Sequence, residues 1–238
     1  MPSSPPSLSV VLLMFNEQDS IVPVLDEHVA FLEQALDDWE IIVVDDGSTD
    51  SSADIASGYA LDDDRVRVVS HGANKGMGAG LATGIHQATK DYFVMNAADG
   101  QIPAAEIGKL LPLLADADIA LSTYAVPRET RARGLLSRGF RLYLNAVSDV
   151  GFELQGLYLF PTAAAVEIEP LIRAKTFFFS FELIQRGIER GLTTASAEIL
   201  VQPRASGSSK VVGVRRILAV AGDALSYGIA KRCGTQGE

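Results

Sequence analysis

The stretch "EIIVVDDGS", residues 40–48, decides the fold class of this chain. Four consecutive apolar residues, 41–44, are typical of a strand buried in a parallel sheet. The carboxylates of Asp45 and Asp46 then emerge at the carboxyl end of the strand, where open α/β sheets bind ligands. Asp46, Gly47 and Ser48 also fit a simple turn that caps the next helix, so both interpretations remain open for this stretch alone.

Similar strand-like runs recur along the first half of the chain, with helical patterns between them. They begin about 25–30 residues apart, the length of one strand–helix unit, so we expect an α/β fold with a mainly parallel sheet flanked by helices. The expected strands are residues 9–15, 40–44, 65–69, 91–95 and 118–124. The expected helices are residues 21–36, a short helix capped by Ser48, Thr49 or Asp50, residues 77–88, and a helix after Pro103.

The second half of the chain is less regular, and we expect it to complete the same domain. Its pattern predicts a basic helix at 135–147, a strand at "GLYLF" (156–160), a helix at 178–189 and a strand at "AEILV" (197–201). No repeat or flexible linker divides the chain. We therefore expect a flexible tail at 1–7, a single domain at 8–210, and a C-terminal amphipathic helix and tail at 211–238.

Composition excludes several classes of protein. Hydrophobic residues make up 47% of the 238 residues, which is enough for a full core, and the net charge of −10 argues against nucleic-acid binding. Cys233 is the only cysteine, so we expect no internal disulfide and a reducing, cytoplasmic location. We also expect neither a signal peptide nor a membrane span, because no run reaches ~18 uninterrupted apolar residues.

Two basic segments interrupt this acidic chain. They span residues 128–141 and 204–232, and each contains a single acid, Glu129 and Asp223 respectively. Solvated helix faces would explain either segment, but together they favour an anionic ligand or an anionic membrane surface. The second segment also carries an apolar stripe, which could lie at the cytoplasmic face of a membrane or pack on the domain.

Three polar motifs follow expected strands: "FNE" (15–17), "DDGS" (45–48) and "AADGQ" (97–101). Because parallel strands end at the same edge of a sheet, these motifs should converge on one site. Glycines in "NKGMGAGLATG" (74–84) would let a helix pack close to the sheet and turn its N-terminal N–H groups toward an anion. The histidines lack metal-ligand spacing, and we expect His28 and His86 on helix surfaces.

These motifs, in this order, resemble those of the family 2 glycosyltransferases. The resemblance runs from about Leu8 to Lys210 and is greatest to the branch that contains dolichol-phosphate mannosyltransferase and bacterial polyprenyl-phosphate glycosyltransferases. "VVLLMFNEQDSI" is similar to the first-strand motif Val-Pro-x-Tyr-Asn-Glu, with Leu13 for Pro and Phe15 for Tyr. "AADGQIP" is similar to Asp-x-Asp-x-Gln-x-Pro, and "PRASGSSK" to Arg-x-x-Gly-x-Ser-Lys.

The resemblance implies a GT-A-like fold, a nucleotide-diphosphate-sugar donor and inversion at the anomeric carbon. The nucleotide-binding residues that it implies are Phe15, Asn16, Glu17, Asp45, Asp46, Asn74 and Gly76, with Asp46 in a supporting role. The catalytic residues that it implies are Asp99, Arg133, Ser137, Arg204 and Lys210. Arg133 and Ser137 would hold the acceptor phosphate, and Arg204 and Lys210 would close over the donor phosphates.

One position departs from the family pattern, because Ala97 stands where the metal motif has its first Asp. We expect a weakened Mg²⁺ or Mn²⁺ site in which Asp99, Gln101 and the donor diphosphate hold the ion; the alternative is that arginines neutralise the diphosphate without metal.

The implied acceptor is a polyprenyl phosphate, which needs no strong general base. A soluble acceptor hydroxyl would need one, with Asp149 and Glu182 as candidates, and a non-catalytic sugar-nucleotide-binding protein remains a further alternative.

Overall fold

The computed structural model describes residues 6–125, 143, 152–203 and 214–233. Its strands are β1 (Leu8–Met14), β2 (Trp39–Asp45), β3 (Val66–Ser70), β4 (Tyr92–Ala97), β5 (Ile119–Tyr124), β6 (Tyr158–Pro161) and β7 (Thr194–Ile199). Its α-helices are α1 (Ile21–Ala35), α2 (Ser52–Tyr59), α3 (Met77–Gln87), α5 (Thr162–Ile168), α6 (Phe178–Glu189) and α7 (Val214–Arg232). Three 3₁₀ segments complete the list: η1 (Ala104–Lys109), η2 (Leu111–Ala115) and η3 (Glu169–Leu171).

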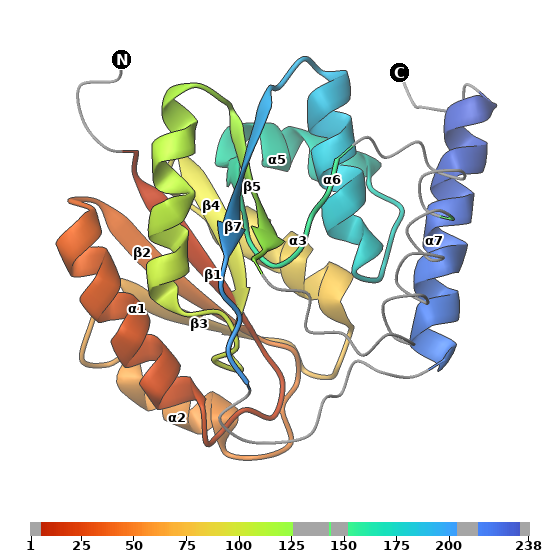
Figure 1. Cartoon of the computed structure of the whole chain (residues 1–238). Coiled ribbons are helices and arrows are strands. Elements are labelled where there is room, and N and C mark those ends of the chain that lie inside the picture. The colour runs from red at the N-terminus through yellow and green to blue at the C-terminus, as the bar shows by residue number, and fades with distance from the viewer. Residues whose placement is uncertain (1–5, 126–142, 144–151, 204–213, 234–238) are drawn as a thin grey trace.

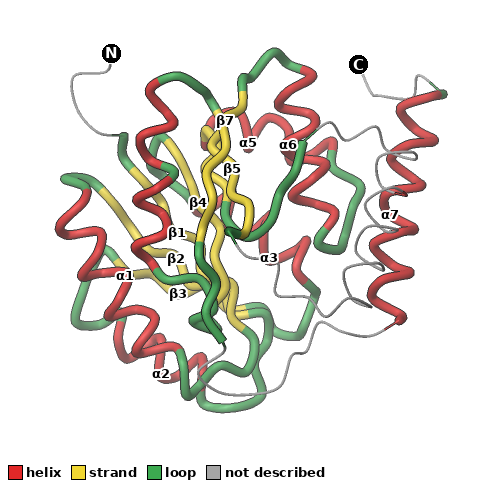
Figure 2. Tube along the Cα trace, in the orientation of Figure 1, coloured by secondary structure: helices red, strands yellow, loops and turns green. Residues whose placement is uncertain are grey.

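The strands form one seven-stranded sheet in the order β3-β2-β1-β4-β6-β5-β7. All neighbours run parallel except β6, which is antiparallel to both β4 and β5. Figure 2 shows the twisted sheet between two layers of helices. The expected mainly parallel α/β domain is therefore confirmed.

Helices cover both faces of the sheet, and alternate residues of the strands supply a core on each side (Figure 1). Leu8, Val10 and Leu12 of β1 pack on the side of α1 and α2, while Val11 packs on the side of α3, α5 and α6. Helix α3 lies close to the sheet because Gly84 has no side chain: a Cβ there would lie 2.4 Å from Cγ1 of Val11. This agrees with the packing role expected of the glycine-rich segment.

Helix α7 packs outside α6, at the right of Figure 1. Ala224 and Tyr227 are buried in the same core cluster as α6, whereas Leu218, Leu225 and Ile229 are exposed. Within the described residues, no helix combines the length and the apolar character needed to cross a bilayer.

The basic helix expected at 135–147 lies outside the described residues, apart from residue 143. The expected elements that differ most from the structure are the helix after Pro103 and the last strand. The helix after Pro103 forms as η1 and η2, and Pro112 in the first turn of η2 explains why a continuous α-helix does not form. The last strand spans Thr194–Ile199 rather than 197–201. It ends at Ile199 because the N–H of Leu200 donates to the Glu106 carboxylate and that of Gln202 to the carbonyl of Gln101.

Candidate functional site

The three polar motifs meet at the carboxyl edge of the sheet. In the strand register, Met14 of β1 pairs with Asp45 of β2, and Leu13 pairs with Ala97 of β4. Beyond the strand ends, the N–H of Asp46 donates to the Met14 carbonyl over 2.9 Å and the N–H of Ala98 to the Leu13 carbonyl over 3.0 Å. The segments "FNE", "DDGS" and "AADGQ" therefore lie side by side, as expected.

Asn16 and the loop after β2 are joined directly. The Ser48 hydroxyl accepts the N–H of Asn16 over 2.9 Å, and the Asn16 side-chain oxygen accepts the N–H of Thr49 over 2.7 Å. Asn16 has a φ of 54°, a left-handed conformation that asparagine tolerates. The N–H of Glu17 donates to the Ser52 hydroxyl over 2.7 Å. The predicted nucleoside residues of the first strand are therefore held against the second.

Asp45 is buried at the end of β2, where it shapes the turn that follows. Its Oδ1 accepts the N–H of Ser48 over 3.0 Å, and the residue is 2% exposed. The carboxyl group of Asp50, in turn, accepts the N–H of Ser52 at the start of α2. The turn that the sequence left as an alternative thus exists, and it positions Asp45 at the carboxyl edge of the sheet. The N-cap of α2 is Ser51 rather than Ser48, Thr49 or Asp50.

Asp46 faces inward and organises the loop before α3. Its Oδ1 accepts Nδ1–H of His71 over 2.9 Å and the N–H of Lys75 over 2.8 Å, and its Oδ2 accepts the N–H of Gly76 over 2.9 Å. The other ring nitrogen of His71 lies 2.9 Å from the Thr83 hydroxyl. Both carboxylate oxygens of Asp46 are therefore used to hold the segment that contains Asn74 and Gly76.

Asn96, directly before "AADGQ", points into the core and holds the turn from both ends. Its oxygen accepts the N–H of Ala97 over 2.8 Å, and its amide nitrogen donates to the Ile102 carbonyl over 3.1 Å and to Nε2 of His28 over 3.2 Å. Asn96 is 2% exposed. It does not replace the missing first aspartate, because its side chain is neutral and points into the core and not toward the site.

The expectation of a surface position for His28 is wrong. His28 is 1% exposed, its Nδ1 donates to the Val24 carbonyl over 2.7 Å, and its Nε2 accepts from Asn96. Burial lowers the pKa of His28 to about 4, because the low dielectric of the core penalises the charged ring. The neutral ring connects α1 to the "AADGQ" turn.

Asp99 and Gln101 lie in a turn that neighbouring segments support. The N–H of Gln101 donates to Asp99 Oδ1 over 3.0 Å, and the Gln101 carbonyl accepts the N–H of Gln202 over 2.8 Å. The Ser20 hydroxyl donates to the Ala98 carbonyl over 2.9 Å. Asp99 is 8% exposed, so the turn presents its carboxyl group from a largely buried position.

Sequence reasoning missed Tyr124, which ends β5 near Asp99. Burial, and then the negative charge of Asp99, raise the pKa of the Tyr124 hydroxyl. The N–H of Tyr124 donates to the Gln155 side-chain oxygen over 3.2 Å. Its place at the carboxyl end of a strand, like the three motifs, was the available signal.

The oxygen atoms of Asp99 and Gln101 fit a hard divalent cation only in part. Mg²⁺ and Mn²⁺ prefer oxygen ligands, and Ala97 supplies none. Within the described ranges, no three His, Cys, Asp or Glu side chains come together as a metal cluster. An ion here would therefore need donor phosphate oxygens or water to complete its coordination.

Glu182 has a structural position within α6. Its Oε1 accepts from Nε and Nη2 of Arg186 over 3.0 and 2.8 Å, and its Oε2 accepts the N–H groups of Arg173 and Ala174. Glu182 is 1% exposed. These bonds fix the segment before α6 and do not favour its proposed role as a general base.

The other candidates, Arg133, Ser137, Asp149, Arg204 and Lys210, lie outside the described residues.

Comparisons with known proteins agree with this arrangement. The family model for "Glycosyl transferase family 2" matches residues 9–167. A dolichyl-phosphate beta-glucosyltransferase of Trichomonas vaginalis is 29% identical over 220 residues, which cover 84% of this chain and 65% of that protein. An undecaprenyl-phosphate 4-deoxy-4-formamido-L-arabinose transferase of Pectobacterium carotovorum is 30% identical over 140 residues, or 58% of this chain and 43% of that protein. The chain thus spans less than two thirds of the length of these relatives.

A solved structure has the same fold. The glucosyl-3-phosphoglycerate synthase of Mycobacterium tuberculosis, in complex with Mn²⁺, uridine-diphosphate-glucose and phosphoglyceric acid, superposes with a TM-score of 0.69 and 21% sequence identity. The match covers 96% of this chain and 80% of the synthase. At this identity the likeness establishes the GT-A-like fold alone.

Proposed function

Because the chain belongs to glycosyl transferase family 2, we propose that it transfers a sugar from a nucleotide-diphosphate-sugar donor to a polyprenyl phosphate. The observation that carries this proposal is the meeting of Asn16, Asp45 and Asp99 at the carboxyl ends of β1, β2 and β4. That edge is where an open α/β sheet binds a nucleotide. The relatives named for dolichyl and undecaprenyl phosphate support the choice of acceptor.

In this proposal the nucleoside lies against Asp45 and Asn16, with Phe15 and Glu17 beside it. A buried carboxylate at a strand end can accept hydrogen bonds from a ribose diol or a base N–H. Asp46 does not touch the nucleoside, since its two oxygens hold the loop at Lys75 and Gly76. Its supporting role is to aim this loop, and with it the start of α3, at the donor phosphates.

Asp99 and Gln101 would hold Mg²⁺ or Mn²⁺ together with the donor diphosphate. When bound, such an ion neutralises the negative charge that develops on the leaving nucleoside diphosphate. Asn96 and His28 hold the "AADGQ" turn through hydrogen bonds within the protein, so Asp99 would be positioned before the donor binds. This preorganisation partly offsets the missing ligand at Ala97.

The acceptor phosphate would attack the anomeric carbon in line with the leaving diphosphate and invert its configuration. A phosphate is already ionised near neutral pH, so no general base is needed and orientation supplies most of the effect. Arg133 and Ser137 would orient the acceptor, while Arg204 and Lys210 would bind the donor phosphates. The exposed apolar residues Leu218, Leu225 and Ile229 of α7 favour a peripheral position at a membrane surface, where the lipid lies.

Calorimetry tests the donor site. UDP-glucose and GDP-mannose are titrated, with and without Mn²⁺, into wild type, Ala97→Asp, Asp99→Asn and the control Asp91→Asn. Asp91 directly precedes the first residue of β4, at the end of the strand that lies away from the site. We expect Mn²⁺-dependent binding that tightens in Ala97→Asp, weakens in Asp99→Asn and is unchanged in Asp91→Asn. Binding with the same affinity in the presence and absence of Mn²⁺ in every variant would indicate that arginines, and not a metal ion, neutralise the donor diphosphate. No binding of either sugar nucleotide would reject a transferase acting on these donors.

Acceptor choice is tested by comparing a short polyprenyl phosphate with the corresponding polyprenol in detergent. We expect sugar transfer to the phosphate and none to the alcohol, because the alcohol lacks the anionic nucleophile. Transfer to the alcohol alone, or to a soluble saccharide alone, would reject the polyprenyl-phosphate acceptor.

Ala97 favours a second candidate, a non-catalytic sugar-nucleotide-binding protein. Donor binding without transfer or donor hydrolysis, even in excess Mn²⁺, is the result that this candidate requires. Recovery of turnover in Ala97→Asp would then identify the missing carboxylate as the cause.

A further inference from the structure

Asp223 is the single acid in the sequence of α7, and it faces the body of the protein. Its Oδ2 accepts three hydrogen bonds: from the N–H groups of Lys175 and Thr176, each over 3.0 Å, and from the Thr176 hydroxyl over 2.8 Å. The bonded segment lies between η3 and α6. The charge that interrupts the apolar pattern of α7 is therefore used to hold backbone of another element.

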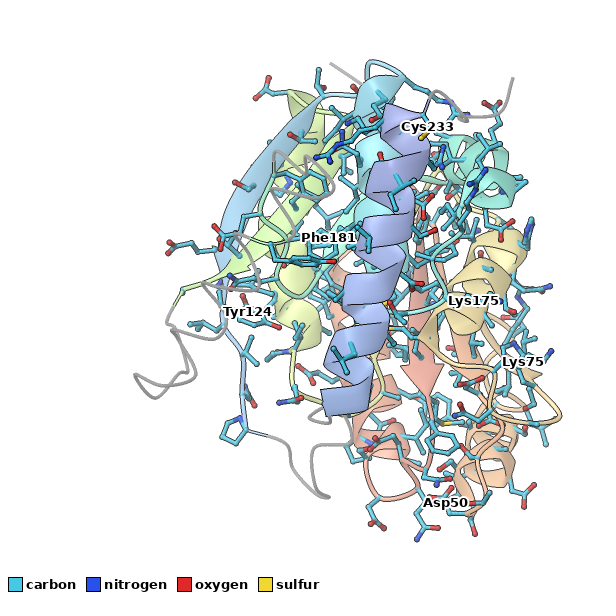
Figure 3. All side chains as sticks on the ribbon, turned by 90° about the vertical axis from the view of Figure 1, so that its right-hand side faces the viewer. Asp50, Lys75, Tyr124, Lys175, Phe181 and Cys233 are labelled. Atoms are coloured by element: carbon cyan, nitrogen blue, oxygen red, sulfur yellow. The ribbon has the colours of Figure 1, made fainter. Side chains whose placement is uncertain are left out.

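The same segment contacts the start of α3 on its other side. The N–H of Gly78 donates to the Lys175 carbonyl over 3.2 Å. A Cβ at Gly78 would lie 2.7 Å from that carbonyl oxygen and 2.8 Å from its carbon, closer than real side chains approach backbone. Lys175 and Lys75 lie on the same side of α7 in Figure 3. The first turn of α3 thus rests directly on the Lys175 peptide.

Two carboxylates fix the segment 173–176 from different helices. Glu182 of α6 accepts the N–H groups of Arg173 and Ala174. Asp223 of α7 accepts the N–H groups of Lys175 and Thr176. Asp46 holds Lys75 and Gly76 from the side of the sheet. The start of α3 is consequently placed by Asp46 on one side and by Asp223, through Lys175, on the other.

We propose that Asp223 is a positioning residue for the donor site, through which α7 sets the place of the α3 N-terminus. This inference rests on the proposed function, in which that N-terminus faces the donor phosphates. Removing the carboxylate releases three hydrogen bonds on the 175–176 segment, which lets Lys175 and the first turn of α3 shift together. Loss of coupling contacts outside a binding site changes affinity by roughly 2- to 30-fold, and we expect a loss of donor affinity in this range.

The test measures the Kd of UDP and of GDP, each with Mn²⁺, for full-length wild type, Asp223→Asn and Asp223→Ala. Donor KM and kcat are measured in parallel. The matched control is Tyr227→Phe, which removes another contact between α6 and α7, the 3.3 Å bond from the Tyr227 hydroxyl to Glu189, without touching the 175–176 segment. We expect Kd and KM to rise in both Asp223 variants, more in Ala than in Asn, and to stay at wild-type values in Tyr227→Phe.

A double-mutant cycle that combines an Asp223 variant with Gly78→Ala tests whether Asp223 acts on α3 through the contact between Lys175 and Gly78. If Asp223 acts through Lys175 on Gly78, the loss in the double variant is smaller than the product of the two single losses. Asp223→Asn takes the place of Asp223→Ala in this cycle if the alanine variant does not fold.

The outcomes separate this inference from the proposed function. Unchanged Kd and KM in folded Asp223 variants, or losses that simply multiply in the cycle, would overturn the positioning role while leaving the donor site intact. Equal losses in Tyr227→Phe would assign the effect to α7 docking in general and likewise reject it. A wild type that binds neither nucleotide would reject the donor site and the inference together.

Discussion

The buried histidine of α1 leads to a quantitative prediction for acid stability. Burial lowers the pKa of His28 from 6.5 to about 4. Between these values the unfolded chain binds a proton that the folded protein does not, so the free energy of unfolding falls as the pH falls through this window. Below about pH 4 the folded protein also binds the proton and the loss is complete. The difference between the two pKa values corresponds to about 3 kcal/mol.

A loss of this size is a large part of the stability of a typical domain, which is about 5–15 kcal/mol. The replacement of His28 by Gln or Leu removes the titrating group, so the unfolding free energy of either variant should fall by about 3 kcal/mol less than that of wild type between about pH 7 and about pH 4. The carboxylates titrate in all three proteins, and their contribution cancels in the comparison. In addition, Leu leaves one amide N–H of Asn96 without its partner, which costs about 1–3 kcal/mol at neutral pH.

The measurement is urea unfolding at a series of pH values, followed by circular dichroism. His86→Gln is the matched control, because it changes a histidine whose side chain is 50% exposed at the surface. Parallel curves for wild type and both His28 variants would refute the reasoning. That result would mean that the ring is hydrated or protonated in the folded protein.

Further predictions concern packing and charge in the core. Gly84→Ala places a Cβ against Val11, and the overpacking should destabilise the fold by about 1–3 kcal/mol. Gly58→Ala in α2 meets no atom within 4 Å and should instead stabilise it by up to about 1 kcal/mol, so equal effects in urea unfolding would refute the contact at Gly84. Glu182→Gln leaves the buried Arg186 uncompensated and should cost about 3–5 kcal/mol. A thermal midpoint within a degree or two of wild type would show that this pair is solvated.

The local pattern of the sequence determined the strand order along the chain and the meeting of the three motifs. Apolar runs such as 41–44 form strands because they can be buried on both faces, and parallel strands necessarily end at one edge. The positions of Asn16, Asp45 and Asp99 at that edge follow from these two facts. Helix α6 was predicted with the same bounds, since its apolar residues recur at helical spacing.

Only the tertiary structure decided where β6 pairs and which way the polar side chains point. Strand β6 lies antiparallel between β4 and β5, a pairing between distant segments that local periodicity does not encode. His28 follows the apolar spacing of Val24, Leu25 and Leu32 in α1, so its burial left a signal, but its partner Asn96 comes from the distant strand β4.

The sequence pattern likewise does not determine which groups the carboxylates bind. Asp45 and Asp46 are adjacent and chemically identical, yet one shapes the turn at the carboxyl edge of the sheet and the other holds the loop before α3. In the sequence Asp223 was the single acid of a basic segment, and its role depends on the backbone of Lys175 and Thr176. A carboxylate is directed by the donors that surround it after folding. Its sequence position therefore determines that it is present at a strand end or on a helix, and the packed structure determines what it binds.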